Sequence, residues 1–252
     1  MSEFWYTRDT MARLNPDYLR YEHFSITHLL IFAVSLAIII LTVYLFKKCS
    51  EEKRIVFIRT VAVLLILNEL ACHVAAIATN QWEWSLLPLH LCSINVFVCA
   101  YNAIKIKTDR FCADLLYATC VPGAFIALLM PVWNILPIFG FMSLNSQIAH
   151  ILLIIYPLLL IANGFFPTLK NLPKVFGVLL AEATLVFIIN KILDTNFFFL
   201  NGTANNFLME FLASILGEKF YFIGFLPILA VLWFFMYLPW YLIEKKKNKI
   251  TK

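Results

Sequence analysis

Charged residues and glycine are scarce in this sequence. Of its 252 residues, 14% are Asp, Glu, Lys or Arg and 62% are apolar, while glycine occurs 7 times. Soluble domains carry roughly 25% charged residues, so this composition excludes an ordinary soluble domain. Several apolar runs approach the roughly 20 residues that cross a bilayer as a helix. The sequence therefore predicts an integral membrane protein.

The patterns of metal sites and disulfide frameworks are also missing. The 6 cysteines form no CxxC pair and lie in or beside apolar runs, which excludes a zinc ribbon or a secreted disulfide framework. There is no HExxH motif, so we expect no metal and no cofactor. An alternative stays open, because three nitrogen or carboxylate ligands with one open position are typical of zinc hydrolases. Its ligands would come from Glu69, His73, His90 and His150.

Hydropathy predicts an all-α, polytopic membrane protein with seven transmembrane helices. The expected spans are about 27–46, 55–79, 86–104, 111–131, 146–164, 173–194 and 220–243. Together they form one transmembrane domain over 27–243. An interfacial N-terminal segment at 1–26 precedes it, and a basic cytoplasmic tail at 244–252 follows it.

Lys and Arg are absent from the second and fourth connections between these spans, and they gather in the first, third and fifth connections and in the tail. Since basic connections stay in the cytoplasm, the N-terminus is expected outside and the C-terminus in the cytoplasm. Arg8, Arg13 and Arg20 work against this orientation. Topology thus accounts for the net charge of +5, and no nucleic-acid partner is expected. Frequent Lys, Asn, Ile and Phe with little glycine favour an AT-rich bacterial genome, and hence a bacterial plasma membrane.

Ionisable side chains inside the predicted spans are the candidates for function, because hydrocarbon makes them costly. Cys92 follows Pro88 and His90 at the start of the third span, roughly 9 Å below the outer boundary at about 1.5 Å per residue. His150 and His73 fall at a similar depth in other spans. The remaining polar residues within about a turn of this layer are Glu69, Asn95, Gln147 and Asn190.

A cysteine becomes a nucleophile when a neighbouring base favours its thiolate. His90 is about 200° round the helix from Cys92, so His150 or His73 is the better candidate base. Glu69 is four residues before His73 and is expected to orient or pair with its imidazole. An anionic intermediate needs hydrogen-bond donors, and the candidates are Asn95, Gln147, Asn190 and His90. The plainer interpretation stays open, in which the cysteine packs and the histidines only join helices.

Four short runs carry a resemblance to a known family. They are His90-Leu-Cys92, the run from Tyr117 to Pro131, His150, and the run from Asp194 to Leu200 that contains Asn196. In this order they resemble the bacterial YwaF-like integral membrane proteins. That family is related to eukaryotic transmembrane protein 164, an acyltransferase that makes polyunsaturated ether phospholipids, and more distantly to the androgen-induced intramembrane threonine hydrolases of fatty-acid esters.

The resemblance implies a role for two residues. Cys92 matches the cysteine proposed as acyl-accepting nucleophile, and His150 matches the histidine proposed as its base. The sequence departs from the family where Met130-Pro131 replaces Thr-Pro and where Asn196-Phe197 replaces Asn-Tyr, so a hydroxyl is missing at each place. These departures concern the acceptor pocket more than the two catalytic candidates.

The leading hypothesis is a membrane lipid acyltransferase or acyl hydrolase that acts on phospholipid-type esters with Cys92 and His150. Membrane lipids are the expected partners, and no oligomeric state is predicted. Two alternatives remain. The polar layer is also typical of a small-solute transporter or binding protein, and a non-catalytic membrane subunit would need neither residue for chemistry.

Overall fold

The computed structural model describes residues 2–14, 20–105 and 108–250. Within these ranges the chain is helical and contains no strand. Short 3-10 turns lie in the connections. The α-helices are α1 (Arg8–Leu14), α2 (Ile26–Lys47), α3 (Glu51–Ala78), α4 (Leu91–Ile104), α5 (Arg110–Leu129), α6 (Phe141–Ala162), α7 (Leu172–Leu193), α8 (Phe207–Leu216) and α9 (Phe225–Ile250). The all-α prediction is confirmed.

In the described part of the chain, 6 helical segments are long and apolar enough to cross a membrane. They are Ile26–Lys47, Glu51–Ala78, Arg110–Leu129, Phe141–Ala162, Leu169–Leu193 and Tyr221–Lys246. The third expected span, at 86–104, forms a shorter helix than predicted. It forms α4, whose 14 residues reach roughly 21 Å, against a hydrocarbon core of about 30 Å.

Local chain chemistry explains why α4 begins late. Leu87 precedes a proline and is extended, with φ −52° and ψ 143°, as the proline ring requires. His90 is extended as well, with φ −69° and ψ 149°, and serves as the N-cap of α4. The apolar run that begins at Leu86 is therefore not α-helical at its start and becomes α-helical only at Leu91.

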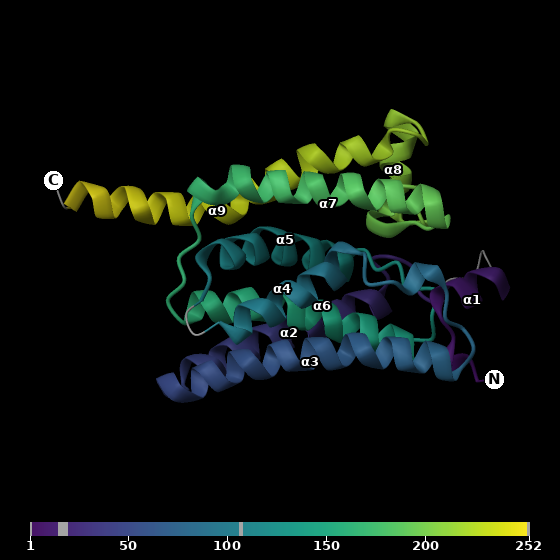
Figure 1. Ribbon diagram of the computed structural model, residues 1–252, viewed down its shortest axis with the longest axis horizontal. Helices are drawn as coiled ribbons and strands as arrows, with labels where there is room; N and C mark the ends of the chain where they lie inside the picture. Colours follow the sequence, from purple (N-terminus) through teal and green to yellow (C-terminus); the bar gives the residue numbers. More distant parts are fainter. Residues whose placement is uncertain (1, 15–19, 106–107, 251–252) are drawn as a thin grey trace.

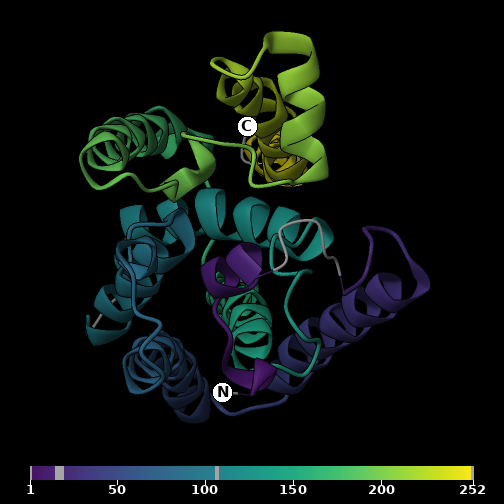
Figure 2. The ribbon, with the colours of Figure 1, turned by 90° about the vertical axis from the view of Figure 1, so that its right-hand side faces the viewer.

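Helix α6 lies at the centre of a bundle. Figure 2 shows α2, α3, α4 and α5 arranged around it, and α6 packs against α2, α3 and α5. Its inward residues Leu153, Tyr156 and Leu159 are fully buried. Helices α7 and α9 lie on the far side of α5 (Figure 1).

Two hydrogen-bonded features fasten the outer helices to the bundle. Pro122 in α5 has no N–H to give to Ala118, four residues earlier, and the indole Nε1 of Trp233 on α9 donates to that free carbonyl at 2.8 Å. One helical turn before Ala118, the buried carboxylate of Asp114 accepts hydrogen bonds from Thr168 N and Asn171 Nδ2. This anchors the connection that leads to α7.

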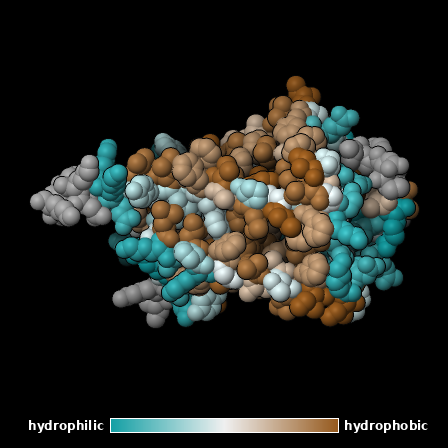
Figure 3. Space-filling view, turned by 90° about the horizontal axis from the view of Figure 1, so that it is seen from above, coloured by the Kyte–Doolittle hydropathy of each residue, from teal (hydrophilic) through white to brown (hydrophobic). Residues whose placement is uncertain are grey.

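The molecule has two unlike ends (Figure 1). The N-terminal end carries α1, α8 and the connections 79–90, 130–140 and 194–206. The C-terminal end carries the connections with most of the Lys and Arg outside the N-terminal region. Figure 3 shows hydrophobic side chains over the middle of one face, with hydrophilic ones toward both ends. This is the surface expected of a protein embedded in a bilayer.

Candidate functional site

Cys92 lies in the first turn of α4, at the N-terminal end of the bundle. The first helical hydrogen bond of α4 runs from Ile94 N to His90 O at 2.9 Å. The N–H groups of Leu91, Cys92 and Ser93 precede it, and none of them has a hydrogen-bond partner in the described ranges. Unpaired N–H groups at a helix start carry partial positive charge and favour an anion beside them. The backbone around Cys92 is therefore suited to stabilise negative charge.

Helices α3 and α5 supply the side chains around Cys92. The half-buried thiol packs against the main hydrophobic core and lies within electrostatic range of Glu69 on α3 and Cys120 on α5. Glu69 Oε1 is 3.8 Å from His73 Nε2, one helical turn away, and the Ser93 hydroxyl is also close to that carboxylate. The predicted i,i+4 pairing of Glu69 with His73 is present, and Cys92 lies beside it.

His150 lies on α6 with a fixed ring. Its Nδ1 is 2.6 Å from the Ser146 carbonyl oxygen, and its imidazole stacks on the indole of Trp133 with centroids 4.9 Å apart. A carbonyl can only accept, so Nδ1 carries the proton and a neutral His150 has its lone pair on Nε2. Nε2 is the nitrogen that can act as a base. No hydrogen bond joins His150 to Cys92 in the part of the chain that is described.

His90 joins three parts of this end of the molecule. Its ring contacts Phe197 and Phe199, with centroid separations of 5.2 Å and 5.3 Å. It also lies within electrostatic range of His150 on α6 and of Arg8 and Asp9 on α1. His90 therefore connects the start of α4 to α6, to α1 and to the 194–206 connection.

Asn95 and Gln147 are used as links between helices. Asn95 Oδ1 accepts from Thr119 Oγ1 on α5 at 3.1 Å, and Gln147 Nε2 donates to Ser35 Oγ on α2 at 2.7 Å. Such bonds satisfy polar groups that would otherwise be buried without partners. Their predicted part in the chemistry stays a prediction.

Asn190 and Asn196 shape the connection after α7. The fully buried Asn190 accepts from Thr195 Oγ1 and Phe197 N and donates to Phe197 O. Asn196 donates to Gly202 O and accepts from Asn201 N. Several non-glycine residues in this connection have positive φ, namely Asp194, Phe198, Phe199, Ala204 and Asn205. The amides hold a strained backbone that presents aromatic rings to His90.

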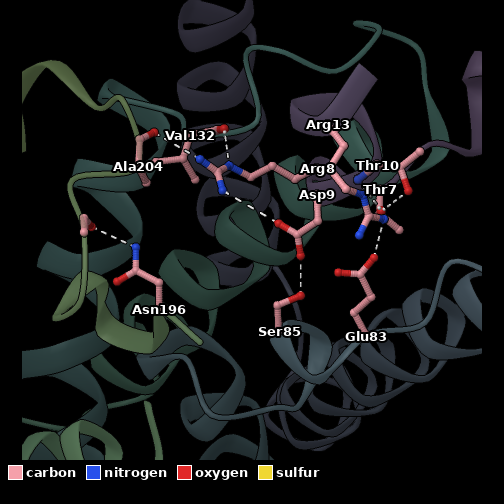
Figure 4. Close-up of polar contacts among 11 residues, drawn as sticks. Thr7, Arg8, Asp9, Thr10, Arg13, Glu83, Ser85, Val132, Asn196 and Ala204 are labelled. Atoms are coloured by element: carbon pink, nitrogen blue, oxygen red, sulfur yellow. Dashed lines mark hydrogen bonds and ion pairs between the residues drawn. The ribbon is translucent and has the colours of Figure 1, made fainter. Parts of the chain in front are cut away.

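Sequence analysis missed the contribution of the N-terminal segment to this region. Arg8 Nε donates to Val132 O at 3.1 Å, and its NH2 group donates to Ala204 O at 3.0 Å (Figure 4). Burial lowers the pKa of Arg8 from its usual value, and Asp9 opposes that shift. Both carbonyl partners are backbone atoms far along the chain, so no residue pattern pointed to them.

The zinc alternative finds no support in the geometry. Among the described residues, no three His, Cys, Asp or Glu side chains are grouped closely enough to hold a metal ion. Glu69 pairs with His73, and His90 lies within electrostatic range of His150, but the four do not form one ligand set.

Comparison with known proteins identifies a family. The model of the TMEM164 family matches residues 9–237. No curated protein and no solved structure matches the chain. The match runs from Asp9 in α1 to Tyr237, halfway along α9, and includes the whole candidate site apart from Arg8.

Proposed function

The chain belongs to the TMEM164 family, and from that premise we propose that it is a membrane acyltransferase or acyl hydrolase with Cys92 as nucleophile and His150 as base. Membership implies an acyltransferase role connected with membrane lipids. The observation that carries the assignment of Cys92 is its position at the start of α4, beside three unpaired backbone N–H groups. The relation to YwaF-like bacterial proteins stays a prediction.

The first half of the reaction forms a thioester. His150 Nε2 takes the proton of the Cys92 thiol while Sγ attacks the carbonyl carbon of a phospholipid-type ester. Negative charge then develops on the carbonyl oxygen. The N–H groups of Leu91, Cys92 and Ser93 are the donors suited to stabilise it. The C–O bond breaks, the departing alcohol oxygen takes the proton from His150, and the acyl group stays on Sγ.

The second half returns the enzyme to its starting state. An alcohol, a lysolipid or water gives its proton to His150 Nε2 and attacks the thioester carbonyl. Sγ leaves and regains the proton. A lipid acceptor makes the protein a transferase, and water makes it a hydrolase.

The membrane arrangement proposed with this chemistry has seven passes, with the N-terminus outside and the C-terminus in the cytoplasm of a bacterial plasma membrane. The N-terminal segment and the end of α9 lie at opposite ends of the molecule (Figure 1), which an odd number of passes requires. Helix α4 and the extended chain before it together form one pass, in addition to the 6 long helices of the described chain. Most of the basic connections lie at the C-terminal end, in agreement with the charge rule.

Intact-mass analysis of the detergent-purified protein after incubation with mixed phospholipids tests this function. Wild type should gain an acyl-sized mass that hydroxylamine removes. Cys92→Ala should gain none, and His150→Ala much less. Cys112→Ala is the matched control, because Cys112 also lies in the first turn of a helix, but its N–H is bonded to Asp109 Oδ1. If wild type shows neither an adduct nor released fatty acid, the proposal is wrong.

A further inference from the structure

The N-terminal segment, residues 2–14, covers the end of the bundle where Cys92 lies. Figure 2 shows α1 over the end of α6, inside the ring formed by the surrounding helices. Met11 on α1 is 5% exposed and belongs to the same hydrophobic cluster that Cys92 packs against, together with Trp133 and Met142. The segment therefore closes the bundle from the N-terminal end.

Polar side chains fasten this segment to the connection at 79–90. Arg13 forms an ion pair with Glu83, and the Asp9 carboxylate accepts from the Ser85 hydroxyl (Figure 4). Gln81 adds a backbone link, since its Oε1 accepts from Thr7 N at 3.0 Å. Each contact joins the segment to the chain that leads directly into His90 and Cys92.

Arg8 fastens the segment to two further connections. Its guanidinium donates to Val132 O and to Ala204 O, and Asp9 lies 4.0 Å away. Because Arg8 and Asp9 are also within electrostatic range of His90, this anchor lies directly beside the candidate site. A displacement of the segment would break all of these links together.

The contacts that hold the N-terminal segment are weak enough to break reversibly. A helix of 7 residues has little stability of its own, and an exposed ion pair such as Arg13 with Glu83 adds at most about 1 kcal/mol, so the loss of that pair should raise the open population severalfold at most. A hollow of about 510 Å³ lies beside the segment, lined by Glu3, Phe4, Arg20 and residues 137–140. The segment is thus held by the buried Met11, by the partly buried Tyr6 and Ala12, by a ring contact of Trp5 with Phe141 and by several polar contacts, next to open space.

We propose that the N-terminal segment is a lid, closed in this structure, whose opening exposes the start of α4 and Cys92 to the aqueous side. Its effect on turnover rests on the proposed function. Its effect on access to Cys92 does not, because a thiol is accessible or inaccessible whatever reaction it takes part in.

A reversible cross-link tests the lid in the full-length protein. Asp9→Cys combined with Ser85→Cys replaces two side chains in contact, and mild oxidation then ties the segment to the 79–90 connection. The readout is the rate at which a sulfonated maleimide, which arrives from water, modifies Cys92, followed by peptide mass analysis. Cys49, at the C-terminal end between α2 and α3, serves as the internal reference in the same sample.

Locking a lid removes its open population, so we expect Cys92 in the oxidised double variant to react about tenfold more slowly, while Cys49 is unaffected. A reductant should restore the rate, and oxidation should not slow the reaction of Cys92 in either single variant, because neither can form the cross-link. Arg13→Ala should speed the reaction of Cys92, whereas Lys105→Ala, a matched loss of an exposed cation at the other end, should not. Equal rates for Cys92 in the oxidised and reduced double variant overturn the lid.

Acyl-adduct formation, measured on the same samples, separates the two proposals. Loss of the adduct on oxidation and its return on reduction support both. If maleimide access follows the lock but no adduct forms in any state, the lid stands and the proposed acyl chemistry fails. An adduct that forms equally in the locked and open states, with equal maleimide rates, removes the lid and keeps the chemistry.

Discussion

The imidazole of His150 lies almost parallel to the indole of Trp133, with an interplanar angle of 24° and ring centroids 4.9 Å apart. Trp133 is 5% exposed, so the stacking surface itself is held firmly by the core. Together with the bond from Nδ1 to the Ser146 carbonyl, the stacking fixes both the rotation and the tautomer of the ring. Nε2, the nitrogen that can act as a base, is therefore oriented before any substrate binds.

Replacing this stacking surface should slow the chemistry. In Trp133→Leu the imidazole loses its flat support, and we expect thioester formation to fall by about tenfold, because small misplacements of a reacting group cost large factors in rate. Trp133→Phe should keep most of the rate. Single-turnover adduct formation measures the effect, and a parallel thermal unfolding curve separates it from the loss of a buried side chain. Equal rates in the Leu and Phe variants would contradict the orienting role.

The start of α4 allows a single backbone N–H to be removed. Leu91→Pro deletes the N–H at the first helical position, where proline is well tolerated, and the extended His90 before it is compatible with proline. We expect acyl-adduct formation to fall by about 10- to 100-fold if that N–H faces the developing oxyanion. Leu91→Ala loses the side chain and keeps the N–H, so it is the control. Equal activity of the two variants would exclude Leu91 N–H as a donor.

Much of this architecture could be predicted from the hydropathy of the sequence. The long spans and the segregation of Lys and Arg into alternate connections follow from composition alone, because the bilayer demands apolar length. Helix α4 is the exception. Leu86 and Leu87 are as apolar as the residues of the helix, and the restriction that Pro88 places on Leu87 keeps the helix from reaching back to the start of the apolar run.

The candidate site was predictable where side chains meet at helical spacing. Glu69 and His73 are four residues apart in the sequence, and their pairing follows from that spacing. The contacts of Arg8 with two distant carbonyls did not follow, because every residue has a carbonyl and the sequence gives no sign of which ones are free. Asn190 was expected near the site for its polarity, whereas the structure uses its amide to fold the following connection.

The indole of Trp233 offers a test of how α9 is held. In Trp233→Phe the carbonyl of Ala118 loses its donor and stays unpaired, since Pro122 cannot supply one. We expect a destabilisation of about 1–2 kcal/mol, typical of polar contacts between membrane helices and of buried unpaired carbonyls. Denaturant unfolding in detergent measures it. Trp84→Phe removes an exposed indole and should change stability little, so equal losses in the two variants would refute the account.

His23 predicts a dependence of stability on pH. It lies before α2, outside the membrane-spanning helices, and burial lowers its pKa, with the neighbouring His28 acting in the same direction and a backbone bond to Pro131 opposing. The folded protein therefore holds His23 neutral at a pH where the unfolded chain already binds a proton. Linkage then requires that stability rises with pH and is lost as pH falls through the ordinary histidine pKa of about 6.5. Thermal midpoints between about pH 7.5 and 5 should fall less in His23→Gln than in wild type. Since other groups titrate in both proteins, the difference between the two curves is the measurement, and parallel curves would show that His23 contributes nothing.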